Sequence, residues 1–321
     1  MPLARRHTVA LVAFPGAQIL DITGPAAVFT TANRELGREH YAVRIVSSSG
    51  EPARTSAAIT LATEPLTALG PRAVDTLLIA GGEQEGIVAA IADRKLRAWV
   101  KRTARQARRF GSVCSGTFVL ASYGLLDERR AATHWNACQR LAERFPRVSV
   151  DADALYVVDG NVWTSAGVTT GIDMCLAMVQ QDLGASVAHA VARQLVVYAR
   201  RPGYQTQFSS TLRAQGQSDS PYAGLCAWLS DNLNQDLGVA ALAAQMGQSP
   251  RDFHRKFLAA MGQSPARFVE ELRLEQARLL LSHQLSLKEI AARTGFGGAV
   301  RLSRAFERRY GVRPSLFRQV H

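Results

Sequence analysis

The chain has 321 residues, of which 47% are hydrophobic, so it can bury the cores of two domains and is not a largely disordered polypeptide. Its formal net charge of +12 favours a polyanionic partner, either nucleic acid or an anionic membrane. The 4 cysteines form no C-x-x-C pair, which excludes that zinc pattern, argues against a secreted disulfide scaffold and fits a cytoplasmic protein.

Residues 1–200 alternate strand and helix signals, which predicts an α/β domain with a doubly wound, mainly parallel sheet covered on both faces. The predicted strands are Val9–Phe14, Tyr41–Val46, Val74–Ala80 and a run closed by Ser112-Val113, followed by a hairpin of Leu155–Val158 and Val162–Thr164. The predicted helices are Gly86–Arg108, Gly116–Tyr123, His134–Phe145, Thr170–Leu183 and Ser186–Ala199. No apolar run approaches the ~20 residues of a membrane span, so no membrane partner is expected.

A cysteine stands where a predicted strand meets a predicted helix. The segment around Cys114 and Ser115 has the layout of a nucleophile elbow, with serine at 112 where the strict motif has glycine. The N-terminus of the following helix is expected to lower the pKa of the Cys114 thiol and to favour anions. Asp21, His134 and the backbone N–H groups of Gly81-Gly82 are candidate partners, the last as oxyanion donors.

Two interpretations of this cluster stay open. As a catalytic thiolate, Cys114 needs a base and an oxyanion hole, for which Asp21, His134 and Gly82 are candidates. As an elbow residue of a binding domain, it lines a ligand pocket or senses oxidation. His134 can also be an ordinary residue at a helix start. The other three cysteines are expected to be small core residues: Cys138, Cys175 and Cys226.

Residues 201–221 change in composition and are interpreted as a linker between domains 1–200 and 222–321. Arg-Arg-Pro-Gly at 200–203 ends the preceding helix, and Gln, Ser, Gly and Asp follow in quick succession. Beyond the linker every signal is helical, and 14 Lys and Arg stand against 8 Asp and Glu. The predicted helices are Ala223–Leu233, Val239–Met246, Arg251–Met261, residues 265–282, Leu287–Arg293 and Ala299–Tyr310.

This all-α domain carries one helix-turn-helix pattern twice. The segment Phe257–Phe268 recurs 49 positions later as Phe306–Phe317. Serines at 249 and 286 are the expected N-caps, and glycines at 262, 295 and 311 mark turns or helix ends. In the first copy, Phe253, Phe257 and Leu258 are expected to face inward.

The duplication favours a protein that grips DNA at two successive points. Two reading helices joined by a helix of roughly 25–30 Å can enter successive major grooves, which lie about 34 Å apart on one face of DNA. The alternative is an ordinary helical bundle with basic, solvated faces. A basic duplicated unit with retained caps and turn glycines makes that alternative the weaker one.

The motif from Ser286 to Phe306, with the Tyr-Gly-Val-Arg-Pro segment after it, resembles the AraC/XylS transcription-regulator signature. The resemblance covers about residues 222–319 and implies base contacts from both outward helix faces. The first helix would use Arg251, His254 and Arg255, and the second Arg301, Ser303 and Arg304. Because residues 297–300 are Gly-Gly-Ala-Val, we expect the second helix to give mostly phosphate contacts, which position the protein without specifying sequence.

Residues 8–198 resemble the PfpI-type, class I amidotransferase-like domains, which implies a flavodoxin-like sheet. Serine follows Cys114 where PfpI peptidases have histidine, and the combination of Asp21 with Cys-Ser-Gly is more similar to isonitrile hydratases. The two domains in this order resemble the GlxA subfamily of AraC regulators. That resemblance implies a sensor domain, often dimeric, with a small metabolite near the old active site; several relatives govern amino-acid, betaine or carnitine catabolism.

The first hypothesis is therefore a cytoplasmic transcription regulator, whose partners are promoter DNA, a small nitrogenous effector, RNA polymerase and a second copy of the chain. The expected ligand-site residues are Asp21, Gly82, Cys114, Ser115, His134 and Asp173. Asp173 either holds a cationic or amine ligand or caps the helix Thr170–Leu183. The second hypothesis is an isonitrile hydratase or amidase-like enzyme using Cys114 and Asp21, with an accessory DNA-binding domain. No metal and no cofactor are expected.

Overall fold

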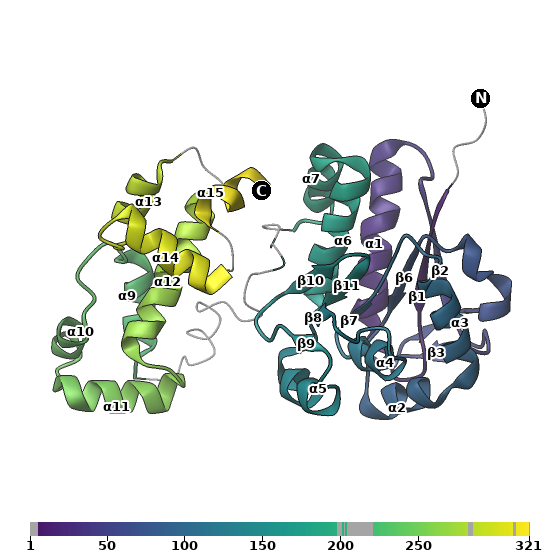
Figure 1. Ribbon diagram of the computed structural model, residues 1–321, viewed down its shortest axis with the longest axis horizontal. Helices are drawn as coiled ribbons and strands as arrows, with labels where there is room; N and C mark the ends of the chain where they lie inside the picture. The colour runs from purple at the N-terminus through teal and green to yellow at the C-terminus, as the bar shows by residue number, and fades with distance from the viewer. Residues whose placement is uncertain are drawn as a thin grey trace. The chain divides into compact units, whose positions relative to one another are not determined.

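Figure 1 shows the computed structural model, which describes residues 6–197, 201, 203, 221–281, 285–310 and 313–320. The chain divides into two compact units, Met1–Gln207 and Phe208–His321. Most of the predicted linker, residues 204–220, lies outside the described residues. In the part of the chain that is described, no helix is both long enough and apolar enough to cross a membrane.

The N-terminal unit is built on a seven-stranded sheet with the order β10-β11-β7-β6-β1-β2-β5. All neighbouring strands in it are parallel except β10 and β11, which form the predicted antiparallel hairpin. The doubly wound, mainly parallel α/β fold is thus confirmed. The strands are β1 (His7–Val12), β2 (Tyr41–Ser47), β5 (Glu64–Pro65), β6 (Thr76–Ile79), β7 (Arg109–Val113), β10 (Tyr156–Asp159) and β11 (Val162–Ser165), with two small pairs outside the sheet, β3 (Ala53–Arg54) with β4 (Thr60–Leu61) and β8 (Arg130–Ala131) with β9 (Ser149–Val150).

Two groups of helices cover this sheet (Figure 1). In one group α1 packs against α6 and α7, and in the other α2 packs against α3 and α4. Apolar side chains from the strands and from both groups form one continuous core, because strands buried on both faces carry unbroken apolar runs. The helices are α1 (Ile19–Leu36), α2 (Gln84–Ala92), α3 (Arg94–Ala104), α4 (Gly116–Ser122), α5 (Cys138–Arg144), α6 (Thr169–Leu183) and α7 (Ala185–Gln194).

Two predicted helices of this unit are wrong in their extent. The single helix expected over Gly86–Arg108 is two helices, because the Asp93 carboxylate accepts the Leu96 N–H at 2.9 Å and caps a new helix there. The helix expected over His134–Phe145 begins only at Cys138, after a 3₁₀ turn that spans Trp135–Ala137. The expected helix Ser186–Ala199 is described only to Gln194, and residues 198–199 lie outside the described residues.

Helix α1 is absent from the sequence prediction. The segment Thr23-Gly24-Pro25 reads as a helix breaker, because proline removes a backbone donor. The structure nevertheless keeps Pro25 inside the helix, with Ile22, Val28 and Phe29 buried on one side. Burial of that apolar side outweighs the local preference, which brings Asp21 into the first helical turn.

A buried ion pair ties α6 to the sheet. The Asp182 carboxylate accepts from the Arg109 guanidinium and, at 2.8 Å, from the Tyr41 hydroxyl. Arg109 also donates to Thr76 at 2.9 Å, and Arg108 pairs with Asp182 from the surface at 2.7 Å. The side chains of Arg109 and Asp182 are only 2% and 1% exposed, so each depends on the other for its polar partners.

The C-terminal unit is helical, and its central helix α12 packs against both α11 and α14. The Ser249 hydroxyl caps α11 and the Ser286 hydroxyl caps α13, the latter in a reciprocal capping box with Glu289. These caps confirm two predicted helix starts. The helices are α9 (Ala223–Asp231), α10 (Val239–Gln245), α11 (Pro250–Met261), α12 (Pro265–Leu281), α13 (Leu287–Arg293), α14 (Ala299–Tyr310) and α15 (Pro314–Val320), the last without a counterpart in the prediction.

The buried side of the first copy of the motif follows the predicted apolar positions with one exception. Phe253 and Phe257 are fully buried, as are Leu302 and Phe306 in the second copy. Leu258 is 44% exposed, so the expectation that it faces inward is wrong. It follows Phe253 by five positions, which turns it about 140° away on a helix of 3.6 residues per turn. Gly311 and Ser282 lie outside the described residues.

The turn of the second helix-turn-helix requires glycine. Gly295 has a φ of 70°, as its predicted turn position suggests, and a Cβ there would lie 2.2 Å from the Leu233 carbonyl oxygen. The turn therefore packs directly on the residues that follow α9. A side chain at 295 would push this turn away from the segment that follows α9.

Candidate functional site

Cys114 occupies a sharp turn between β7 and α4. Its φ of 57° lies in the left-handed region, which costs a non-glycine residue about 1–2 kcal/mol. Its backbone N–H donates to the Ser165 carbonyl at 2.9 Å, and a Cβ on Gly167 would lie 2.3 Å from the Cys114 Cβ. The loop after β11 therefore closes tightly over the turn, and only glycine fits at 167.

Asp21 lies in the first turn of α1 and is buried against this cysteine. One carboxylate oxygen accepts the Val168 N–H at 2.8 Å and the other accepts the Gly81 N–H at 3.0 Å. The Cys114 side chain lies beside the same carboxylate, close enough for each group to shift the pKa of the other. Asp21 thus connects the end of β6, the cysteine turn and the start of α6.

Burial favours the protonated forms of both Asp21 and Cys114. It raises the pKa of Asp21 to about 6, although the hydrogen bonds from Val168 and Gly81 and the neighbouring Cys114 thiol act to lower it. Burial, and after it the charge of Asp21, raises the pKa of the Cys114 thiol to about 12. The expectation that the helix N-terminus lowers the pKa of this thiol is wrong, because desolvation beside a carboxylate outweighs the bonds that Ser115 provides.

The two backbone donors expected to form an oxyanion hole already have acceptors in this chain. The Gly81 N–H donates to Asp21, and the Gly82 N–H donates to the Ser115 hydroxyl at 3.0 Å. The Ser115 hydroxyl in turn lies 3.2 Å from the Gly82 carbonyl oxygen, to which it donates. A ligand oxygen has to displace one of these bonds to use either N–H group.

His134 is connected to the cysteine turn through its neighbour. The Thr133 hydroxyl donates to the Cys114 carbonyl at 3.0 Å, whereas His134 Nδ1 lies 2.7 Å from Asn136 Oδ1. Trp135, beside it, is 52% exposed. The imidazole is therefore engaged locally, at the edge of the segment that supports the turn.

Asp173 pairs with a cation of the same chain, the Arg201 guanidinium. It is 4% exposed and accepts from Arg201, whose Nε lies at 2.9 Å and whose backbone N–H lies at 3.0 Å. It sits inside α6, whose N-cap is Val168, so it does not cap that helix. The guanidinium of Arg201 also donates to Thr169 at 2.8 Å. The other three cysteines are buried, as expected.

We predict that the Cys114 thiol of the native protein is alkylated slowly by iodoacetamide. A pKa of about 12 leaves only about one thiol in 10⁴ ionised at pH 8, and the thiolate is the reactive form. Asp21→Asn removes the neighbouring charge and should speed the reaction. Peptide mapping by mass spectrometry reads each cysteine separately, with fully buried Cys175 as the internal reference. Labelling of Cys114 at the rate of a free cysteine would contradict the raised pKa.

The outward face of α11 presents the basic residues expected to read DNA. Arg251, His254 and Arg255 are all exposed, whereas Phe253 and Phe257 of the same helix are buried. Arg255 pairs with Asp252 at 3.2 Å, and Asp252 also accepts from the Ser249 hydroxyl at 3.1 Å. The pair lies at the surface, with the two side chains 70% and 55% exposed, so the Arg255 guanidinium can exchange Asp252 for another partner.

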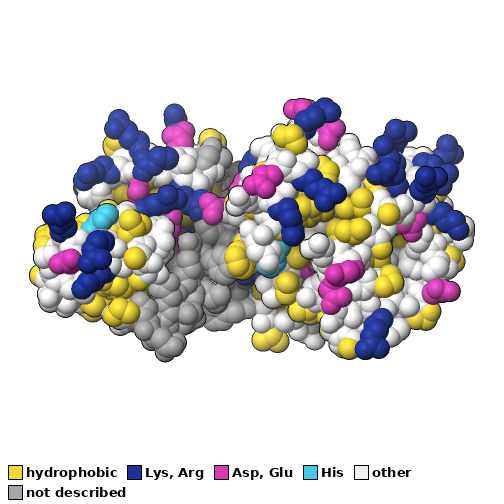
Figure 2. Space-filling model, turned by 90° about the horizontal axis from the view of Figure 1, so that it is seen from below, with side chains coloured by type: hydrophobic (Ala, Val, Ile, Leu, Met, Phe, Trp, Pro, Cys, Tyr) yellow, Lys and Arg dark blue, Asp and Glu magenta, His cyan; other side chains and the backbone are white. Residues whose placement is uncertain are grey.

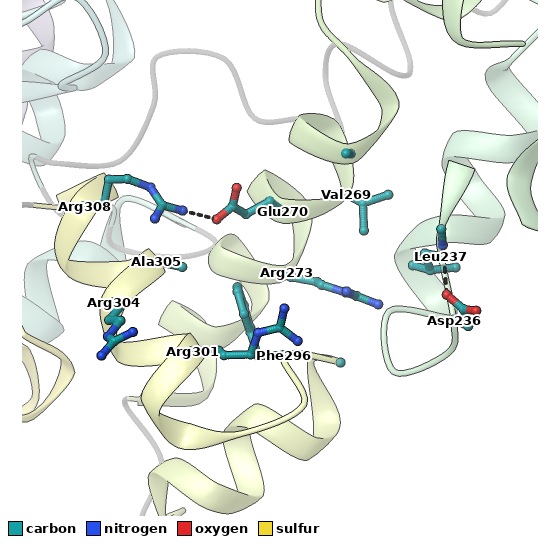
Figure 3. Close-up of a pocket in the computed structure, with 13 residues that line it drawn as sticks. Asp236, Leu237, Val269, Glu270, Arg273, Phe296, Arg301, Arg304, Ala305 and Arg308 are labelled. Carbon is teal, nitrogen blue, oxygen red and sulfur yellow. Dashed lines mark hydrogen bonds and ion pairs between the residues drawn. The ribbon is translucent and has the colours of Figure 1, made fainter. Parts of the chain in front are cut away.

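Helix α14 presents arginines beside a groove of about 560 Å³ (Figure 3). Arg301 and Arg304 are exposed, have no ion pair within the described residues, and line this groove. Arg308 lies further along α14 and pairs with Glu270 of α12. Ser303 is half-buried. The groove therefore offers two arginines without carboxylate partners, beside a pair that fixes α14 on α12.

Arg273, which also lines the groove, has a structural role. Arg273 of α12 donates to the carbonyl oxygens of Leu233 at 3.0 Å and Gln235 at 2.8 Å, so it holds the segment between α9 and α10.

Sequence reasoning missed Arg273, Glu270 and Asp252. Folding brings Arg273 and Glu270 to their partners, and Asp252 bonds the capping serine of its own helix. Sequence reasoning also missed Val168 and Arg201, for which the sequence carries no signal. Figure 2 shows that Lys and Arg outnumber Asp and Glu on the visible face of the C-terminal unit, at the left.

Comparisons with known proteins agree with both units. The DJ-1/PfpI family matches residues 7–181, and a helix-turn-helix domain matches residues 242–319. The HTH-type transcriptional regulator GbdR of Pseudomonas aeruginosa (strain UCBPP-PA14) is 30% identical over 303 residues, which are 94% of this chain and 81% of GbdR. The HTH-type transcriptional regulator GlxA of Rhizobium meliloti (strain 1021) is 29% identical, over 90% of this chain and 88% of GlxA.

Two further proteins are similar to the N-terminal unit. An isonitrile hydratase of Pseudomonas putida is 32% identical over 199 residues, which are 62% of this chain and 81% of the hydratase. The crystal structure of a THiJ/PfpI family protein from Pseudomonas syringae superposes with a TM-score of 0.55 at 24% identity, covering 69% of this chain and 89% of that protein. The structural similarity supports the fold alone.

Proposed function

This chain belongs to the GlxA-type transcriptional regulators of the AraC family, which join a DJ-1/PfpI domain to a helix-turn-helix domain, and from that membership we propose how it regulates. The C-terminal unit reads promoter DNA in two successive major grooves. The N-terminal unit binds a small, nitrogenous effector beside Asp21 and Cys114, and the bound effector changes DNA binding.

The observation that carries the DNA part is the duplicated reading helix. Helices α11 and α14 each bury one side on α12 and leave Arg251, His254 and Arg255, or Arg301 and Arg304, exposed. Helix α12 has 17 residues, a length of roughly 25 Å at 1.5 Å per residue. A rigid connection of that length suits two helices that enter grooves about 34 Å apart.

The two copies have unequal roles in this proposal. Helix α11 reads bases, because its exposed face carries two arginines and a histidine within one and a half turns. Residues 297–300, Gly-Gly-Ala-Val, lead into helix α14 and contain no polar side chain, and the arginines of this helix lie along a groove. Arg301 and Arg304 therefore bind backbone phosphates, which set the register of the protein on DNA.

The effector part rests on the buried carboxylate of Asp21. Burial raises its pKa to about 6, so an ammonium or another N–H donor placed beside it would stabilise the charged form. Binding of such an effector near pH 6 would release protons, which calorimetry in buffers of different ionisation enthalpy detects. By the resemblance to GlxA-type regulators, the protein is also proposed to dimerise through the N-terminal unit, to work in the cytoplasm and to contact RNA polymerase.

A chain of contacts leads from this carboxylate to the start of the linker. Asp21 accepts the Val168 N–H, and the next residue, Thr169, accepts from Arg201. Val168 has a φ of 52°, a conformation that its neighbours must impose. A ligand that displaces the Asp21–Val168 bond would release this strained turn and loosen Arg201, from which the chain continues toward the DNA-binding unit.

We predict that Asp21→Ala raises amide hydrogen exchange at both ends of this chain of contacts. The Val168 amide loses its acceptor and should exchange about tenfold faster, the value of one net hydrogen bond. The Arg201 amide, bonded to Asp173, should also exchange faster, because the turn that precedes Thr169 relaxes. An exposed carboxylate of the same unit provides the control Glu39→Ala. Faster exchange at Val168 with an unchanged Arg201 would refute the coupling.

Genome-wide mapping of bound sites tests the whole proposal. We expect a common sequence of two half-sites about 10 base pairs apart, upstream of genes whose products act on nitrogenous metabolites. The reactions of those gene products would indicate which metabolites to test for binding to the protein. Occupancy spread over the genome without a shared sequence would contradict sequence-specific reading.

An enzymatic role is the second candidate, favoured by the position of Cys114 beside the buried Asp21 carboxylate and by the similarity to an isonitrile hydratase. Isonitriles, amides and aldehydes are assayed with the full chain and with Cys114→Ala. We expect no turnover with either protein, because the thiol is protonated and both backbone donors are occupied. Turnover that disappears on substitution would establish the enzyme instead.

A further inference from the structure

A second concave site lies on the N-terminal unit, away from the cysteine turn. It is a cavity of about 500 Å³ between α3, the residue Ser48 after β2, and the segment of residues 66–71. That volume lies within the range of roughly 300–1,000 Å³ that small-molecule sites occupy. None of its lining residues belongs to the site around Asp21 and Cys114.

The floor of this cavity is apolar and fixed. Leu66, Leu69 and Trp99 are between 3% and 6% exposed, and all three line the cavity. The Trp99 indole N–H donates to the Leu69 carbonyl at 2.9 Å, which holds the ring against the opposite wall. The site is therefore formed before any ligand arrives, which lowers the entropy cost of binding.

The rim of the cavity is cationic. Arg94, Lys95 and Arg102 of α3 line it, all three are exposed, and none has an ion pair within the described residues. The lining contains no aspartate or glutamate. The nearest acid on the same helix, Asp93, is engaged by the Leu96 N–H as the cap of α3.

The position of two of these cations strengthens the argument. Arg94 and Lys95 stand in the first turn of an 11-residue helix, where the helix dipole is positive and lysine or arginine is unfavourable. An anion bound there would satisfy both cations and the dipole at once. Arg102 follows Lys95 by seven positions, about two turns, and so lies on the same side of the helix.

We propose that this cavity is a second ligand site, which binds an organic anion whose carboxylate or phosphate group meets Arg94, Lys95 and Arg102 while its compact apolar body lies on Trp99 and Leu69. The three cations set the charge of the ligand, and the fixed floor sets its size. The proposal does not depend on the effector proposed beside Asp21, because the two sites share no residue.

The test measures binding of small probes to the full chain by calorimetry and ligand-observed NMR. Phenylacetate carries the carboxylate, phenyl phosphate carries the phosphate, and phenylacetamide is the neutral match. We expect saturable binding of at least one anion below about 10 mM, weaker by about tenfold or more for phenylacetamide. The stronger of the two anions identifies the source of the negative charge.

Variants locate the site. Arg94→Gln and Arg102→Gln should each weaken the anion by about tenfold, the value of one charge-assisted hydrogen bond. Arg105→Gln, an exposed arginine after the same helix that does not line the cavity, is the matched control and should bind normally. Thermal melts confirm that each variant is folded.

Three outcomes would overturn the proposal. They are the absence of saturable binding of both anions, equal binding of phenylacetamide, and equal losses in the Arg105→Gln control. A fourth arm titrates DNA: if Arg94→Gln weakens DNA binding while leaving both probes unaffected, the cations belong to a DNA-contacting surface and the ligand site is refuted. None of these results bears on the site at Asp21 and Cys114.

Discussion

Arg255→Ala is expected to weaken specific promoter binding by about 1–3 kcal/mol and to relax the preference for one base pair. The Arg255 side chain is 70% exposed and pairs at the surface with Asp252, which is itself bonded to the capping serine of α11. Its planar guanidinium can exchange this exposed carboxylate for the two acceptors of a guanine. The loss should appear with the cognate sequence and be much smaller with unrelated DNA.

The matched variant is Arg304→Ala, because Arg304 stands 49 positions later in the second copy of the motif. If it binds a phosphate, its loss weakens cognate and unrelated DNA alike and reduces the slope of log affinity against log salt by about 1. Fluorescence anisotropy over a salt series, with a mapped site and a scrambled one, separates the two behaviours. Equal loss of specificity in both variants would show that the halves read sequence equally.

Asp182→Ala is expected to lower the free energy of unfolding of the N-terminal unit by about 3–5 kcal/mol. The substitution leaves the Arg109 guanidinium, 2% exposed, without its carboxylate and removes the acceptor of the Tyr41 hydroxyl. A buried charge without a partner costs far more than the intact pair contributes. Urea unfolding followed by near-ultraviolet circular dichroism measures the change.

The control is Glu64→Ala, whose partner Arg44 lies at the surface. Those two side chains are 39% and 37% exposed, so water replaces the lost partner and the expected loss is below about 1 kcal/mol. Equal losses in the two variants would contradict a special role for burial.

The stability contributed by the Asp182–Arg109 pair depends on pH. Burial acts to raise the pKa of Asp182, but the bonds and charge of Arg109 hold it below its usual value. The stabilisation of the folded unit by this pair is therefore present at neutral pH and lost as the pH falls through the pKa of Asp182 in the folded protein.

The candidate site shows where sequence reasoning is reliable and where it fails. The layout of a strand, Cys114 and a helix is local, and the elbow was recognised from five consecutive residues. The hydrogen bond between Asp21 and Val168 joins residues 147 positions apart, and no sequence pattern near either residue predicts that they meet. The pKa of the thiol was expected to fall and instead rises, because it depends on burial and on a carboxylate that folding brings to it.

The sequence by itself determined the class of the protein and the ends of most helices. The capping serines at 249 and 286 act through bonds within a few residues, and the repeat at 49 positions can be seen by comparing the sequence with itself, so both are visible without a structure. Only the tertiary structure decided which polar groups share a buried environment. It paired Asp173 with Arg201, Asp182 with Arg109 and Asp21 with Cys114, because hydrogen bonding of buried charges depends on distance in space.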